Sequence, residues 1–230
     1  MGKAFWAIVA VLTCAAQVLD WLYLNAQRRG DQRQGLIRKA SASACFLLLG
    51  GIALTQCGRP LIGWLIFLGL LFGFAGDVVL DLRYLYPKKH DRYFALGMLL
   101  FGLGHLCYIP ALLLIDAPAW LPALPVCVVM LLLVKLYTVW RGVQAGKLLL
   151  PGTFYLAIAC YMGGLAAVIA VRGFSAGTLL FAIGGVLFPI SDSILTAYTF
   201  GRKRRFAQSM LLHIAYYLAQ CLIAAAILSL

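Results

Sequence analysis

Residues 184–196 read GGVLFPISDSILT, and apolar residues flank this stretch on both sides. A charged aspartate deep in a membrane helix costs about 2.5–3.5 kcal/mol on insertion scales, so it is tolerated mainly where it faces protein or a water pocket. Asp192 therefore indicates a helix with one polar side, either a functional site or a packed polar patch between helices. Pro189 predicts a kink beside it, because proline lacks the amide hydrogen and clashes with the carbonyl of Gly185.

The composition around this stretch is that of a membrane protein. The 230 residues are 64% hydrophobic and 11% charged, and the mean hydropathy is +0.97. These values lie outside the soluble range and predict an all-α polytopic membrane protein with a single transmembrane domain. Apolar runs of about twenty residues, the length that spans about 30 Å of hydrocarbon, predict eight transmembrane helices. The runs lie near residues 4–24, 40–56, 61–82, 94–115, 118–137, 153–171, 175–199 and 207–230.

The net charge of +12 would suit a nucleic-acid partner, but the placement of the basic residues predicts membrane topology instead. Most of the 19 Lys and Arg residues fall in alternate loops: Arg28, Arg29, Arg33, Arg38 and Lys39; Arg83, Lys88, Lys89 and Arg92; Lys135, Arg141 and Lys147; and Arg202, Lys203, Arg204 and Arg205. The opposite side holds Lys3, Arg59 and Arg172. The positive-inside rule predicts cytoplasmic basic loops and external termini, in a bacterial inner membrane. The expected partners are membrane lipids, with no nucleic acid.

The sequence predicts neither disulfides nor a metal site. Seven cysteines lie mostly inside the apolar runs, and none has C-x-x-C spacing, so they are interpreted as small buried residues. The chain contains no Glu, and His90, His105 and His213 lie on different segments. We therefore expect no metal and no other cofactor.

A second acid occurs at the depth of Asp192. Asp77 follows a run of apolar residues at the end of the third predicted helix, which runs toward the same side of the membrane. At 1.5 Å per residue, the two carboxyl groups lie in one layer. Gly69, Gly73 and Gly76 form a small-residue stripe before Asp77, which would let another helix approach closely.

Two further aspartates are interpreted as interfacial charges. Asp81 is expected to pair with Arg83 or Lys88 near the membrane surface. Asp20, beside Trp21 and Tyr23 in the first helix, is likewise interpreted as an interface residue.

Polar residues also recur on single faces of other predicted helices. One face carries Gly97, Phe101, Gly104, His105 and Tyr108. Another carries His213, either Tyr216 or Tyr217, and Gln220, and Tyr155 and Ser191 lie in the sixth and seventh helices. A lone buried histidine is commonly a structural donor. Because acids, histidines and tyrosines converge in these spans, we expect His105, Tyr108, Tyr155, Ser191, His213, Tyr216 and Gln220 to bind substrate or to tune the two acids.

Four of these motifs carry a resemblance. The stretches are Gly76-Asp77-Val78-Val79-Leu80, His105-Leu106-Cys107-Tyr108, Ser191-Asp192-Ser193-Ile194-Leu195, and Tyr216 with Gln220. In order and spacing they resemble the YhhN family of membrane proteins, which includes the lysoplasmalogenases; Thr196 departs from the alanine common there. The resemblance implies an eight-helix hydrolase that cleaves the vinyl-ether bond of lysoplasmalogens to a fatty aldehyde and glycerophosphocholine or glycerophosphoethanolamine. It also implies that the catalytic aspartates are Asp77 and Asp192.

The residue types suit this chemistry. An enol ether is cleaved by protonating carbon and capturing the resulting cation with water, so one acid and one base suffice. A carboxyl group in an apolar pocket can remain protonated at neutral pH while a better solvated one stays ionised. The sequence leaves open which aspartate is the acid, the roles of the histidines, the headgroup, the oligomeric state, and phosphate contacts at Arg83, Arg202 and Lys203. A proton-coupled transporter of lipids or small molecules is the alternative.

Overall fold

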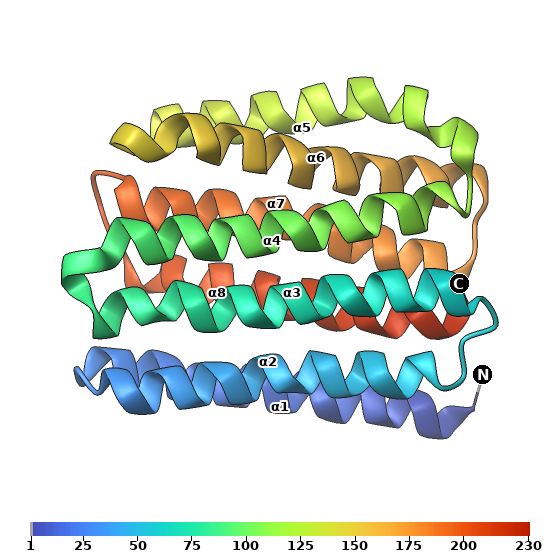
Figure 1. Ribbon diagram of the computed structural model, residues 1–230, viewed down its shortest axis with the longest axis horizontal. Coiled ribbons are helices and arrows are strands. Elements are labelled where there is room, and N and C mark those ends of the chain that lie inside the picture. The colour runs from blue at the N-terminus through green and yellow to red at the C-terminus, as the bar shows by residue number, and fades with distance from the viewer. Residues whose placement is uncertain (1) are drawn as a thin grey trace.

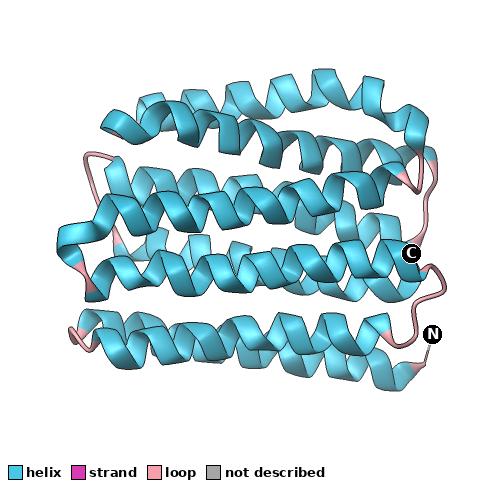
Figure 2. Cartoon of the chain, viewed as in Figure 1, coloured by secondary structure: helices cyan, strands magenta, loops and turns pink. Residues whose placement is uncertain are grey.

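The computed structural model describes residues 2–230, which form eight helices long and apolar enough to span a membrane (Figures 1 and 2). The helices are α1 (Lys3–Arg28), α2 (Gln32–Leu54), α3 (Pro60–Leu85), α4 (His90–Leu113), α5 (Trp120–Trp140), α6 (Leu149–Arg172), α7 (Ala176–Phe200) and α8 (Phe206–Ala226). The fold predicted from the sequence, all-α with eight transmembrane helices, is confirmed. Short 3-10 turns precede α4, α5 and α6, and another follows α8.

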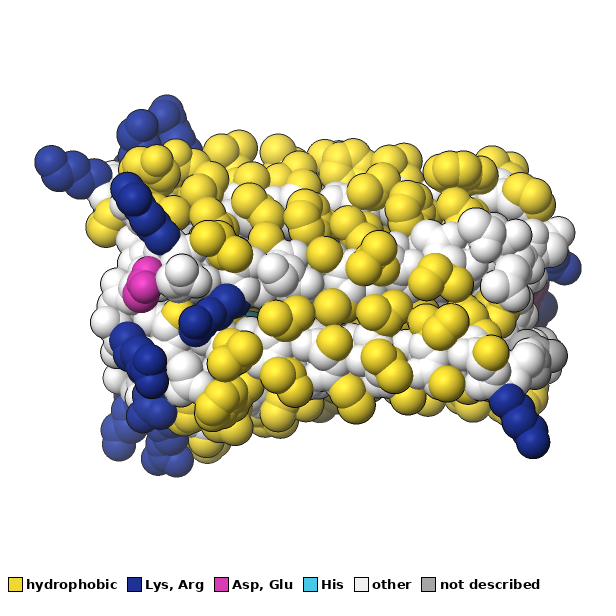
Figure 3. Space-filling model, turned by 90° about the horizontal axis from the view of Figure 1, so that it is seen from below, with side chains coloured by type: hydrophobic (Ala, Val, Ile, Leu, Met, Phe, Trp, Pro, Cys, Tyr) yellow, Lys and Arg dark blue, Asp and Glu magenta, His cyan; other side chains and the backbone are white. Residues whose placement is uncertain are grey.

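The helices pack antiparallel in a bundle two layers deep (Figure 1). On one face α2, α3 and α4 lie side by side, and on the other α1, α8 and α7 do so, while α5 and α6 close one edge. Both termini lie at the same end of the bundle. Lys and Arg side chains gather at the opposite end (Figure 3), which is called the basic end below.

Apolar side chains predominate between the two ends of the bundle on the face that Figure 3 shows. The exposure is greatest on α5, where Leu132, Leu133 and Leu136 are 58–66% exposed. Burial is greatest in α8, which lies against α1, α2 and α7. An apolar outer surface of membrane-spanning length is what a lipid-facing bundle requires, because lipid does not force apolar side chains inward as water does.

Glycines bring the central helices close together. A Cβ atom at Gly104 of α4 would lie 2.9 Å from the carbonyl oxygen of Gly69 in α3, and one at Gly184 of α7 would lie 2.7 Å from that of Ala219 in α8. The stripe predicted in α3 also accommodates side chains, since a Cβ atom at Gly73 would lie 2.6 Å from Nε2 of Gln220. The stripe thus lets α3 approach both α4 and α8.

The start of α2 differs from the sequence prediction. The apolar run begins near residue 40, but the helix begins at Gln32, where Asp31 caps it by accepting a hydrogen bond from the backbone N–H of Gln34 at 3.0 Å. Hydropathy marks where a helix enters hydrocarbon and not where its hydrogen bonding begins, so the two polar turns were missed. Lys39, which the sequence analysis placed in a basic loop, therefore lies about two turns inside α2.

Candidate active site

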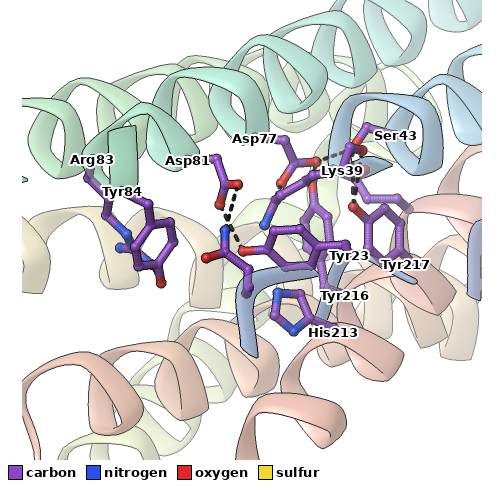
Figure 4. Close-up of polar contacts among 12 residues, drawn as sticks. Tyr23, Lys39, Ser43, Asp77, Asp81, Arg83, Tyr84, His213, Tyr216 and Tyr217 are labelled. Atoms are coloured by element: carbon purple, nitrogen blue, oxygen red, sulfur yellow. Dashed lines mark hydrogen bonds and ion pairs between the residues drawn. The ribbon is translucent and has the colours of Figure 1, made fainter. Parts of the chain in front are cut away.

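Asp77 lies inside the bundle, eight residues before the end of α3, with 1% of its surface exposed. Its Oδ2 atom accepts hydrogen bonds from Oγ of Ser43 at 2.6 Å and from the hydroxyl of Tyr216 at 2.7 Å. Its Oδ1 atom lies 3.5 Å from Nζ of Lys39 (Figure 4). Residues from α2, α3 and α8 therefore converge on one carboxyl group.

Further hydrogen bonds hold the partners of Asp77 in place. Nε2 of Gln220 donates to the hydroxyl of Tyr216 at 3.1 Å, one turn away on α8. The hydroxyl of Tyr217 lies 3.3 Å from Oγ of Ser43 and donates to the backbone carbonyl of Lys39 at 3.4 Å. The sequence predicted Tyr216 and Gln220 as members of the site, with Tyr217 as the alternative to Tyr216 on that face. It did not predict Ser43.

Lys39 is the most important residue that the sequence analysis missed. Its side chain is buried beside Asp77, and its ammonium group lies 5.1 Å from the centre of the Tyr23 ring. Asp20 and Asp81 also interact with it electrostatically. A buried lysine is tolerated where acids compensate its charge. The available signal was the i, i+4 spacing of Lys39 and Ser43, which places both on the face of α2 that enters the bundle.

Two aspartates interpreted as interfacial are buried, which corrects that interpretation. Asp81 is 2% exposed and accepts hydrogen bonds from the Tyr23 hydroxyl at 2.8 Å and from Nε2 of Gln27 at 3.4 Å, and it forms no ion pair with Arg83. Asp20 is also 2% exposed, and its Oδ1 atom has no hydrogen-bond partner in residues 2–230. The sequence indicates how far along a helix each aspartate lies, but not whether its side chain points into the bundle or outward.

Asp192 has a different environment from Asp77. It lies eight residues before the end of α7, and its Oδ2 atom accepts a hydrogen bond of 2.5 Å from the hydroxyl of Tyr155 on α6. In the described part of the chain, no Lys or Arg nitrogen lies within 4.0 Å of this carboxyl group. The Tyr155 hydroxyl also lies 3.5 Å from Nε2 of His105, at the limit of a hydrogen bond.

The remaining predicted residues form no hydrogen bond to either carboxyl group in the described part of the chain. Oγ of Ser191 donates to the carbonyl of Phe188, and Nδ1 of His213 lies 2.8 Å from the carbonyl of Ser209. Tyr108 packs its ring 6.1 Å from that of His105, and its buried hydroxyl has no partner among the described residues. Ser191 and His213 line the same pocket as Asp77 and Asp192. Tyr108 does not line that pocket.

Two cavities meet at Asp192. The polar pocket, about 350 Å³, lies among α1, α2, α3, α7 and α8 near the basic end. Its lining includes Lys39, Asp77, Asp192 and His213. The apolar pocket, about 360 Å³, lies among α4, α5, α6 and α7, and its lining is almost entirely hydrocarbon. Asp192, Phe101, Leu80 and Leu195 line both cavities. The carboxyl group of Asp192 therefore lies at the boundary between the polar pocket and the apolar pocket.

Within residues 2–230 no three His, Cys, Asp or Glu side chains are placed to hold a metal ion, and all seven cysteines are free thiols. The site itself is defined by its acidic side chains. It contains two carboxyl groups, one with a cationic partner and one with a tyrosine partner.

This combination defines a polytopic α-helical membrane protein with a buried two-carboxyl site between a polar and an apolar pocket. The chain belongs to the YhhN family, whose model matches residues 37–227. That range contains both aspartates, Lys39 and all the site residues predicted from the sequence. No curated protein and no solved structure matches the chain.

Proposed function

We propose that the protein is a lysoplasmalogenase, a hydrolase that cleaves the vinyl-ether bond of a 1-alkenyl lysophospholipid and releases a fatty aldehyde and glycerophosphocholine or glycerophosphoethanolamine. The YhhN family is known for this activity. The observation that carries the proposal is the position of Asp192 between the polar and apolar pockets. A lysoplasmalogen has one hydrocarbon chain and one polar headgroup, and its vinyl ether lies between them.

The substrate fits this arrangement in one orientation. The alkenyl chain enters the apolar pocket between α4, α5, α6 and α7, and the headgroup occupies the polar pocket near the basic end. The vinyl ether then lies beside Asp192, with Asp77 on the polar side. Binding energy from the chain and headgroup positions the reacting bond against the carboxyl groups. We also propose that the basic end faces the cytoplasm and that both termini are external.

The two carboxyl environments suggest separate roles. The ammonium group of Lys39, 3.5 Å from Asp77, stabilises Asp77 as the ionised carboxylate. Asp192 has the Tyr155 hydroxyl as its partner and no neighbouring cation, so a buried negative charge is disfavoured there. Asp192 therefore acts as the general acid, and Asp77 acts as the general base.

The reaction proceeds in balanced proton transfers. Asp192 donates its proton to the vinyl carbon that is not bonded to oxygen, which leaves a cation shared by the other vinyl carbon and the ether oxygen. Asp77 accepts a proton from water as the water oxygen bonds to that carbon and forms a hemiacetal. On collapse, the hemiacetal hydroxyl returns a proton to Asp192, the carbon–oxygen bond breaks, and Asp77 gives its proton to the departing glycerol oxygen. One water is consumed, and both residues are restored.

The test is an assay with purified protein in detergent, where a transporter has no compartments and leaves the substrate's bonds intact. A 1-alkenyl lysophospholipid should yield a long-chain aldehyde even when a metal chelator is present. A matched lysolipid with a saturated alkyl ether should yield none. The saturated ether has no double bond to protonate, so it forms no stabilised cation. Equal cleavage of both lipids would exclude the mechanism. Folded protein that releases no aldehyde would exclude the proposed activity and favour the transporter.

A further inference from the structure

Arg83 is buried in the polar pocket with most of its donors unused. It lies near the end of α3 and is 4% exposed, and only its Nη2 atom donates a hydrogen bond, to the hydroxyl of Tyr84 at 2.9 Å. Its Nε and Nη1 atoms are buried and have no hydrogen-bond partner in residues 2–230. The sequence analysis counted Arg83 among the charges of a basic loop, so its burial is a correction.

No acid within the described residues forms an ion pair with Arg83. The ion pairs there are Lys39 with Asp77, His90 with Asp91, and Arg172 with Asp116. Asp81 interacts with Arg83 electrostatically, but it accepts its hydrogen bonds from Tyr23 and Gln27. An unpaired buried guanidinium group is costly, and an anion with several acceptor oxygens removes that cost.

Aromatic rings hold the guanidinium group in place. Its central carbon lies 4.7 Å from the centre of the Tyr84 ring and 5.1 Å from that of Phe94. A second arginine, Arg28, lines the same pocket at the basic end and rests on the Phe206 ring at 4.1 Å. Stacking of this kind fixes the planar donor fork before a ligand binds, and such forks suit phosphate oxygens.

We infer that the polar pocket is a phosphate-binding site, with Arg83 as its principal ligand and Arg28 as a second contact. This inference rests on the proposed function in taking the phosphate as that of the lysolipid headgroup; the alternative source is free inorganic phosphate. Arg83 lies six positions after Asp77 in α3, about 9 Å along the helix. An extended glycerophosphate spans a comparable length between its phosphorus and the vinyl ether, so a phosphate on Arg83 sets the reacting bond at the level of the acids.

The test measures binding and not turnover, so that its result is independent of the proposed reaction. The ligands are a 1-alkyl lysophospholipid, which has no vinyl ether, and the 1-alkylglycerol of the same chain length, which has no phosphate. Wild-type protein should bind the phospholipid roughly tenfold to a hundredfold more tightly, as expected for hydrogen bonds to a charged group. Equal affinity for the two ligands would overturn the inference without any variant, and it would leave vinyl-ether cleavage unaffected.

Two variants assign the preference to Arg83. In Arg83→Gln the affinity for the phospholipid should fall most of the way to that for the alkylglycerol, with Arg28 retaining the rest, while the alkylglycerol binds as before. Arg83→Lys, which keeps the charge but loses the fork, should retain part of the preference. Arg92→Gln is the matched control, because Arg92 is an exposed arginine at the same end and should bind like wild type. A full preference in folded Arg83→Gln would overturn the assignment.

Inorganic phosphate distinguishes the two sources. If the headgroup is the ligand, millimolar phosphate should compete weakly or not at all with the phospholipid. If phosphate alone binds in an Arg83-dependent way and the phospholipid gains nothing over the alkylglycerol, the headgroup assignment is overturned.

Discussion

Replacing Lys39 by methionine should separate the structural role of the buried ion pair from its chemical role. At an effective dielectric constant of about 20, unit charges 3.5 Å apart attract each other by about 5 kcal/mol. Removing one partner of a buried pair typically costs about 3–5 kcal/mol, because the other charge is left uncompensated. For a chain of this length the melting temperature should fall by on the order of 10 °C.

The loss of activity in Lys39→Met should be larger than the loss of folding stability explains. If Asp77 is the base proposed above, the loss of the Lys39 cation that stabilises its carboxylate should lower turnover by about 10²–10⁴-fold. The double variant Lys39→Met with Asp77→Asn removes both charges and should recover much of the lost stability, although Asp20 and Asp81 keep recovery incomplete. It should recover no activity.

The assay combines two measurements on each variant. Unfolding in detergent can be followed with a thiol-reactive dye, because Cys45, Cys160 and Cys221 are free and buried. Aldehyde release reports activity, and Lys89→Met, a change at an exposed lysine, is the control. Lys39→Met with the stability and turnover of wild type would refute the reasoning, as would a double variant no more stable than Lys39→Met.

Three further predictions concern the acids, their partners and the topology. Asp77→Asn and Asp192→Asn should each lower aldehyde release by about 10²–10⁴-fold in protein that still purifies as one species. Asp91→Asn, a change at an exposed carboxyl group, should leave aldehyde release unchanged. Substantial turnover by Asp77→Asn or Asp192→Asn would exclude the two-carboxyl mechanism. Tyr155→Phe should lower kcat roughly tenfold to a hundredfold by removing the hydrogen bond to Asp192. Tyr161→Phe, whose hydroxyl donates to the Trp120 carbonyl, should leave kcat unchanged, and an unaffected Tyr155→Phe argues against Asp192 as the acid. Reporter fusions at Gly30, His90, Gly146 and Arg204 should read cytoplasmic and a fusion at Leu230 external, and a cytoplasmic Leu230 would reverse the proposed orientation.

The sequence by itself determined the eight helices and the two main acids. Both follow from local properties: the length of an apolar run sets a span, and the cost of a carboxyl group in hydrocarbon makes Asp77 and Asp192 conspicuous. The equal depth of these residues could also be read from the chain, since each lies eight residues before the end of its helix. The pairing of Tyr216 with Gln220 follows from their spacing of one turn.

The tertiary structure alone decided what the acids contact. Ser43 and Tyr216 meet at Asp77 from positions 34 and 139 residues away in the chain, and Tyr155 meets Asp192 from another helix. Such meetings depend on how each helix is rotated about its axis and which neighbour it packs against, and hydropathy encodes neither.

The same physical reason explains why the sequence placed Lys39 and Arg83 at the membrane surface. Lys39 and Arg83 lie in sequence beside basic loops, so their neighbours in the chain indicate a membrane surface. In the folded bundle α2 and α3 turn these side chains inward, toward Asp77 and the polar pocket. A charge near a helix end can face either water or the protein interior, and only the packing of the other helices around it decides which.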